Sequence, residues 1–177
     1  PKLFEIYKSY KLWGKRLNVT SAASLNQLIH DRKESEFIDI TETLQTKRIS
    51  TIADEILKKK SARIVLIAGP SSSGKTTTSK KLALQLEAIG YKPKVISLDS
   101  YYLGRAQTPK DENGNYDYEC LEALNIELLN QNLVDLFAGK QIKLPSYDFH
   151  AGVSYFKGGT MTLEESDILI MEGIHGL

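Results

Sequence analysis

The sequence predicts an α/β fold in which helices flank a parallel sheet, preceded by a mainly helical amino-terminal segment. Two observations carry this prediction. Short apolar runs at residues 64–68, 94–98 and 168–171 are typical of strands buried in a parallel sheet. Helical patterns at 75–89 and 121–137 lie between these runs, and alternating strands and helices indicate a parallel α/β sheet.

Residues 1–60 are read as an amino-terminal segment or linker, and one domain is predicted over 61–177. Residues 1–40 mix aromatic and charged side chains without clear periodicity, and we assign them no function. Lysines at 58–60 suit the carboxyl terminus of a preceding helix, where positive charge is favourable. Apolar residues at helical spacing predict that amphipathic helix: Ile49, Ile52, Ala53, Ile56 and Leu57.

Two helices are expected inside the domain. The helix at 75–89 ends at Gly90, and the leucine-rich helix at 121–137 ends at Gly139, because glycine commonly follows a helix carboxyl terminus. One face of the first helix carries the apolar residues Leu82, Ala83, Leu86 and Ile89.

The sequence also predicts a short exposed strand and an unpaired strand edge. Ile142 and Leu144 alternate with lysines before Pro145, which suggests a short exposed strand. The first strand, at 64–68, is expected to keep one edge unpaired. Because such an edge invites self-association, a homo-oligomer is left open.

The composition is that of an ordinary globular chain. Of 177 residues, 41% are hydrophobic and 25% are charged, and 23 Lys and Arg against 22 Asp and Glu give a net charge of +1. A nucleic-acid-binding protein usually has a clear basic excess, so nucleic acid is not expected as a partner. The one cysteine, Cys120, excludes an internal disulfide and a thiolate zinc cluster. The apolar runs are too short to cross a membrane, and we expect a cytoplasmic protein without a membrane partner.

The strongest motif is a glycine-rich phosphate loop placed between a predicted strand and a predicted helix. Gly69, Gly74, Lys75 and Thr76 satisfy the pattern Gly-x-x-x-x-Gly-Lys-[Ser/Thr]. Its backbone N–H groups and the helix amino terminus would surround the phosphates of ATP, while Lys75 bridges the outer phosphates and Thr76 ligates Mg²⁺. The predicted nucleotide-binding residues are Gly69, Ser71, Ser72, Ser73, Gly74, Lys75, Thr76 and Thr77.

Two carboxylates complete the predicted catalytic set with Lys75. Asp99 follows the second strand, at the edge where open α/β sheets bind ligands, and could accept a hydroxyl proton or hold Mg²⁺. Glu172 follows the third strand and is expected beside the metal with Thr76 and Asp99. A helix-capping role for Asp99 and an exposed strand end at Glu172 are the structural alternatives.

Five blocks follow one another along the chain: Gly69–Thr76, Leu98-Asp-Ser-Tyr-Tyr102, Asn115-Tyr-Asp-Tyr118, Leu144-Pro-Ser-Tyr-Asp-Phe149 and Ile170-Met-Glu-Gly-Ile174. In this order they resemble the uridine kinase and phosphoribulokinase family. The resemblance covers about residues 64–177. The stretch upstream resembles the region that precedes the kinase in bacterial uridine-kinase-like proteins, which is related to the amino-terminal part of threonyl-tRNA synthetase. The chain is therefore expected to be a fragment that keeps only the end of that region.

The resemblance implies roles for individual side chains. Asp99 would be the base that accepts the proton of the substrate's primary hydroxyl, and Asp117 would bind sugar hydroxyls. Tyr147 would contact the substrate's base, and Tyr102 and His150 complete the predicted substrate site. The residues themselves leave alternatives open: a turn-forming Asp117, a core Tyr147 and a loop His150.

The sequence departs from nucleoside-specific members of that family. In those members a His follows the Tyr-Asp-Phe block after other residues, whereas His150 follows Phe149 directly, so uridine is not fixed as the substrate. His175 is read as a turn residue, and Arg105 as a ligand of substrate or as a solvated loop residue. Kinases of this type use a mobile lid with arginines that close over the phosphates, and this fragment is expected to lack it, so little turnover is expected from this chain alone.

The predicted function is ATP- and Mg²⁺-dependent phosphoryl transfer to a primary hydroxyl of a nucleoside or sugar-like small molecule. One alternative is a kinase for another alcohol, such as a sugar phosphate or pantothenate. Another is a regulatory ATPase that responds to RNA or to a protein partner. A GTPase is disfavoured, because no Asn-Lys-x-Asp sequence is present.

Overall fold

The computed structural model describes residues 2–59, 61–157 and 159–176. The chain forms two compact units, Pro1–Lys47 and Arg48–Leu177, which are treated separately below. The division falls within a helix, and the last residues of the predicted amino-terminal segment pack in the second unit. No helix in the described part of the chain is both long enough and apolar enough to span a membrane.

The first unit is helical. It contains α1 (Lys2–Arg16), α2 (Ala22–His30) and the beginning of α3 (Glu34–Lys58). Ser21 caps α2 through reciprocal hydrogen bonds with Ser24. Among residues 4–47, whose side chains are described, none is buried. The predicted helical character of this segment is therefore present, although it has no core of its own.

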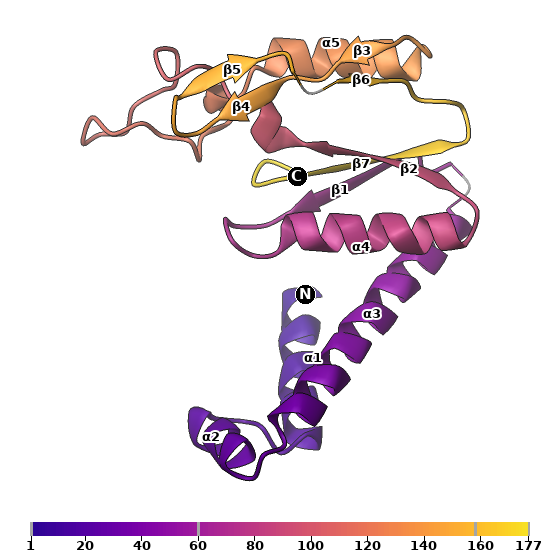
Figure 1. Cartoon of the computed structure of the whole chain (residues 1–177), viewed down its shortest axis with the longest axis vertical. Coiled ribbons are helices and arrows are strands. Elements are labelled where there is room, and N and C mark those ends of the chain that lie inside the picture. Colours follow the sequence, from indigo (N-terminus) through magenta and orange to yellow (C-terminus); the bar gives the residue numbers. More distant parts are fainter. Residues whose placement is uncertain (1, 60, 158, 177) are drawn as a thin grey trace. The chain divides into compact units, whose positions relative to one another are not determined.

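The second unit is built on a three-stranded parallel sheet in the order β1-β7-β2. The strands are β1 (Ile64–Ala68), β2 (Lys92–Ser97) and β7 (Asp167–Gly173). All three predicted strands are confirmed, and β7 inserts between the two earlier ones (Figure 1). Within the described residues β1 pairs with β7 alone, so its other edge is unpaired as predicted.

One face of the sheet is covered by α4 (Lys75–Ala88) (Figure 1). Leu82 and Leu86 are buried against Ile168 and Ile170 of β7, together with Ile49 and Ala53 of α3. The prediction that Ile89 shares this apolar face is wrong: Ile89 is 41% exposed, because it follows the last helical residue. Helix α3 ends at Lys58, and Lys60 of the predicted lysine run lies outside the described residues.

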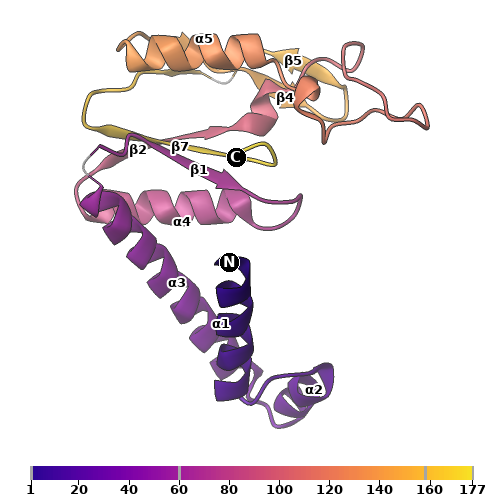
Figure 2. The ribbon, with the colours of Figure 1, turned by 180° about the vertical axis from the view of Figure 1, so that it is seen from behind.

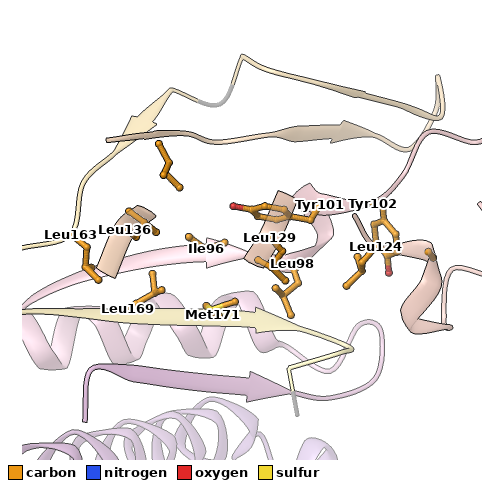
Figure 3. Close-up of a cluster of buried hydrophobic side chains, with 12 residues drawn as sticks. Ile96, Leu98, Tyr101, Tyr102, Leu124, Leu129, Leu136, Leu163, Leu169 and Met171 are labelled. Atoms are coloured by element: carbon orange, nitrogen blue, oxygen red, sulfur yellow. The ribbon is translucent and has the colours of Figure 1, made fainter. Parts of the chain in front are cut away.

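The opposite face is covered by α5 (Ile126–Phe137), as the reverse view also shows (Figure 2). Leu169 and Met171 of β7 share the larger core with Leu129 and Leu136 of α5 (Figure 3). The predicted start of this helix at residue 121 is wrong. The residues before it form the short helix η2 (Leu121–Ala123), and Asn125 begins α5 by accepting a hydrogen bond from the Leu128 N–H at 3.1 Å.

Two small antiparallel sheets of two strands each lie on the same side of the main sheet as α5 (Figure 1). They pair β3 (Ile142–Lys143) with β6 (Thr160–Met161), and β4 (Ser146–Asp148) with β5 (Val153–Tyr155). The strand predicted around Ile142 is present, but the prediction that it is exposed is wrong for this residue. Ile142 is only 4% exposed, because it belongs to the core that α5 also forms.

Candidate active site

The phosphate loop joins the end of β1 to the start of α4 (Figure 1). Ser72 and Gly74 have positive φ angles of 58° and 83°, which turn the backbone back on itself. A Cβ on Gly69 would lie 2.9 Å from the Ser73 hydroxyl oxygen, so the first glycine is needed for close approach. The Lys75 ammonium donates to the Pro70 carbonyl at 2.8 Å and closes the loop from the inside. The segment therefore adopts the curled shape that the motif predicts.

The phosphate-loop helix and the middle strand meet through a hydrogen bond between residues 96 positions apart. The Thr76 hydroxyl donates to Oε1 of Glu172 at 3.1 Å. Glu172 lies in β7 and is 2% exposed, so the alternative of an exposed strand-end carboxylate is wrong. Its second oxygen, Oε2, is buried and has no hydrogen-bond partner in the described chain, which leaves one acceptor for a ligand.

Asp99 lies in the short helix η1 (Leu98–Tyr101), which follows β2, a strand that pairs with β7. The approach is close, because a Cβ on Gly173 would lie 2.7 Å from Cβ of Leu98. Burial, and next the nearby Glu172 carboxylate, raise the pKa of Asp99, while the Lys75 ammonium and the His175 imidazole act to lower it. Asp99 therefore lies within electrostatic range of Lys75 in the phosphate loop and of Glu172 and His175 at the end of β7.

This arrangement fits a magnesium ion. Mg²⁺ prefers oxygen ligands and usually takes one or two protein carboxylates together with substrate phosphates and waters. The unpartnered Oε2 of Glu172 and the hydroxyl of Thr76 are such ligands. The described residues contain no group of three or more His, Cys, Asp and Glu side chains suited to a metal, so the ion would depend on phosphate oxygens for much of its shell.

Beside Asp99 lies an aromatic cluster formed by Tyr102, Tyr118, Tyr147 and Phe149. The rings of Tyr147 and Phe149 are 4.8 Å apart, and Tyr102 lies 5.5–5.6 Å from each of the other three. Burial, followed by the negative charge of Asp99, raises the pKa of Tyr102 to about 12. Burial also raises the pKa of Tyr147 to about 12. The cluster therefore offers apolar ring surface next to the predicted base.

The predicted substrate residues differ in how available they are. Tyr102 is buried, and its hydroxyl donates to the Tyr118 carbonyl at 3.0 Å. Oδ1 of Asp117 accepts from the backbone N–H groups of Glu119 at 2.8 Å and Cys120 at 3.2 Å, so this carboxylate shapes the turn before η2. Substrate contacts by Tyr102 and Asp117 stay predictions.

His150 is exposed at the turn between β4 and β5. Its backbone N–H donates to Asp148 at 2.8 Å, and its carbonyl accepts from Arg105 at 3.2 Å. Arg105 also donates to the Phe149 carbonyl at 3.2 Å, so the structure gives this arginine a part in holding the turn. A substrate contact by His150 stays a prediction.

Sequence reasoning did not select Tyr118 and Phe149 as site residues, although both stand in the blocks that carry the resemblance. Phe149 is 53% exposed and packs on Tyr147. The hydroxyls of Tyr118 and Tyr147 are 3.4 Å apart. The only signal available in the sequence was their place inside those blocks, since ring contacts across 29 positions leave no local pattern.

A parallel sheet with a phosphate loop after one strand and carboxylates at the ends of its neighbours defines a P-loop kinase fold. The profile of the Phosphoribulokinase / Uridine kinase family matches residues 64–177. The chain belongs to this family of small-molecule kinases. The match begins at the first residue of β1, and the likeness of the upstream segment to threonyl-tRNA synthetase stays a prediction.

Several relatives and solved structures are similar to the chain. A uridine kinase of Macrococcus caseolyticus is 39% identical over 114 residues, which are 64% of this chain and 53% of that protein. A uridine kinase of Staphylococcus aureus is 34% identical over 67% of this chain and 55% of that protein. The chain thus spans about half the length of the curated relatives it matches.

Solved structures agree with this family. A possible uridine kinase from Bacillus stearothermophilus superposes with a TM-score of 0.58 at 30% identity, covering 72% of this chain and 70% of that chain. D-glycerate 3-kinase from Cryptococcus neoformans has a TM-score of 0.55 at 19% identity, over 73% of this chain and 51% of that one. The second likeness is one of fold alone.

Proposed function

We propose that this protein transfers the γ-phosphoryl group of ATP, with Mg²⁺, to a primary hydroxyl of a nucleoside or sugar-like small molecule. The main observation in support is the hydrogen bond from Thr76 to Glu172. The second carboxylate oxygen of Glu172, Oε2, is buried and has no hydrogen-bond partner among the described residues. This pair joins the phosphate loop to the middle strand, and Asp99 lies within electrostatic reach. The family membership of the chain supports the same reaction class.

The nucleotide side of the reaction rests on the phosphate loop. Backbone N–H groups of the loop and the start of α4 would bind phosphate oxygens, and Lys75 would leave the Pro70 carbonyl to reach the outer phosphates. Thr76, Glu172 and Asp99 would hold the ion. Bound Mg²⁺ would neutralise charge on the phosphate oxygens. Positioning and charge neutralisation supply most of the catalysis in this class of reaction.

The acceptor side rests on Asp99. The acceptor oxygen attacks the γ-phosphorus, the bond from that phosphorus to the bridging oxygen of ADP breaks, and the hydroxyl proton passes to the Asp99 carboxylate. The raised pKa of Asp99 suits a proton acceptor better than an ordinary exposed aspartate.

The aromatic cluster supports an acceptor with a flat or apolar face. Ring surfaces of Tyr147 and Phe149 next to Asp99 could stack on a nucleobase or on the apolar face of a sugar. Asp117 and His150 remain the proposed polar contacts. A nucleoside would use the rings fully, whereas a small linear alcohol would leave them uncovered.

The test is a search for phosphorylated products by mass spectrometry. The chain is incubated at high concentration with Mg²⁺, ATP and a mixed pool of nucleosides, sugars, sugar phosphates and pantothenate, because slow turnover is expected. We expect a product heavier by one phosphoryl group with the wild-type chain and none with Lys75→Ala. Lys80→Ala is the matched control, since Lys80 is an exposed lysine on the same helix.

Two outcomes would contradict the proposal. Equal product formation by Lys75→Ala would remove the phosphate loop from the reaction. Hydrolysis of ATP with no phosphorylated small molecule, stimulated by RNA or by a protein, would instead support the regulatory ATPase that the sequence left open.

A further inference from the structure

The turn after β7 carries a half-buried imidazole that the proposed reaction has not yet used. His175 stands three positions after Glu172, directly beyond the end of the strand. Its Nε2 is buried and has no hydrogen-bond partner among the described residues. Buried polar side-chain atoms almost always have a partner, so such an atom calls for an explanation.

The turn that carries His175 is fixed against the start of the phosphate loop. A Cβ on Gly176 would lie 2.9 Å from the Ile67 carbonyl oxygen and 3.3 Å from the Ala68 nitrogen. Ala68 is the last residue of β1 and precedes the loop itself. This close backbone approach, which only glycine permits, holds the neighbouring imidazole at the same edge of the sheet as Thr76 and Glu172.

His175 also faces the predicted base. The imidazole and the Lys75 ammonium both act to lower the pKa of Asp99, so both side chains lie within electrostatic range of that carboxylate. Nε2 of His175 makes no hydrogen bond to Asp99 or Glu172 in the described chain. The imidazole is therefore beside the reacting groups without being committed to either carboxylate.

The chemistry of the site decides which ligand atom can satisfy Nε2. An acceptor hydroxyl has one proton, and in the proposed reaction Asp99 takes it. The transferred phosphoryl group offers oxygen acceptors only, which require a donor. An imidazole that carries a proton on Nε2 is such a donor.

We propose that His175 contacts the nucleotide, donating its Nε2–H to an oxygen of the γ-phosphoryl group of bound ATP. This inference rests on the proposed function and adds a residue to it. The acceptor of this hydrogen bond is a charged oxygen, and hydrogen bonds to a charged group contribute more than neutral pairs. It would also distinguish ATP from ADP, which lacks the group that His175 contacts.

The direct test is a long-range ¹H–¹⁵N spectrum of the imidazole side chains. The sequence has three histidines, His30, His150 and His175, so each resonance can be assigned with single His→Gln variants. On addition of Mg²⁺ and a non-hydrolysable ATP analogue, we expect the Nε2 resonance of His175 to shift, and to shift less with ADP. His30 is an exposed residue of the first unit and serves as the internal reference.

Affinities give an independent reading. Loss of the hydrogen bond in His175→Leu should weaken the ATP analogue about tenfold and leave ADP unchanged. His175→Gln keeps a donor and should recover part of the loss, and His30→Gln should bind both nucleotides as the wild type does. A purely structural role for His175 would weaken both nucleotides equally, and thermal melts of each variant check folding.

The outcomes separate this inference from the proposed function. The analogue could bind to the wild type and fail to bind to Lys75→Ala. If, in that case, the His175 resonance does not shift and His175→Leu binds the analogue as tightly as the wild type, the inference is wrong and the kinase proposal stands. If ³¹P spectra show no binding of either nucleotide to the wild-type chain at millimolar concentration, both are overturned.

Discussion

The hydrogen bond between Thr76 and Glu172 can be tested by removing one hydroxyl. Thr76→Val keeps the shape and β-branching of the side chain but deletes the donor. Glu172 is 2% exposed, its Oε1 accepts from Thr76 at 3.1 Å, and its Oε2 has no hydrogen-bond partner among the residues that the structure describes. The substitution therefore leaves a buried carboxylate without the side-chain hydroxyl that now binds it.

The expected loss follows from the charge of the acceptor. A hydrogen bond to an ionised group contributes roughly 1.5–3 kcal/mol, and an unsatisfied buried acceptor costs a similar amount. We expect Thr76→Val to lower the free energy of unfolding by about 2 kcal/mol. For a chain of this size that corresponds to a fall of about 4–8 °C in the thermal midpoint.

A double-mutant cycle isolates the interaction. Urea denaturation, followed by circular dichroism, is measured for the wild type, Thr76→Val, Glu172→Leu and the double variant. We expect a coupling energy of about 1 kcal/mol or more, because the two groups are in direct contact. Thr77→Val makes the same chemical change at the next, exposed position of α4 and should alter stability by less than about 0.5 kcal/mol. Additive single variants, or an equal loss in Thr77→Val, would refute the reasoning.

Three further predictions follow from the same region. Because the pKa of Asp99 is raised, the folded chain binds this proton more tightly than the unfolded chain and loses stability as pH rises from about 4 towards neutrality. Asp99→Asn should therefore melt at a higher temperature than the wild type at pH 7 in differential scanning fluorimetry, with no gain at pH 3. The same variant should form no phosphorylated product. Gly173→Ala would put a Cβ 2.7 Å from Cβ of Leu98 and should cost about 1–3 kcal/mol in urea denaturation; a wild-type midpoint would show that η1 yields freely. Arg105→Ala should speed hydrogen exchange at the amide of Gly152 in the β4–β5 turn, because the arginine packs against this glycine and donates to two carbonyls of the turn. Unchanged exchange would contradict the role of Arg105 in holding the turn.

The glycine-rich loop illustrates what the sequence determined by itself. Its spacing, the apolar run of β1 before it and the helical period of α4 after it are all local patterns, and local patterns report the hydrogen bonding and burial period of one segment. For the same reason the other two strands and the positions of Asp99 and Glu172 near strand ends were predicted correctly. The start of α5 was predicted too early. The Asn125 side chain accepts a hydrogen bond from the Leu128 N–H and so fixes where the helix begins, whereas the apolar pattern continues through this point and does not show the boundary.

Only the tertiary structure decided which of these segments meet. The sequence does not say that β7, from the end of the chain, inserts between β1 and β2, and that order is what brings Glu172 to Thr76 across 96 positions. The burial of Ile142, the ring cluster around Tyr147 and the unpartnered imidazole of His175 arise in the same way. Side-chain contacts between distant segments depend on how the layers pack, and packing leaves no periodic trace in any one stretch of sequence.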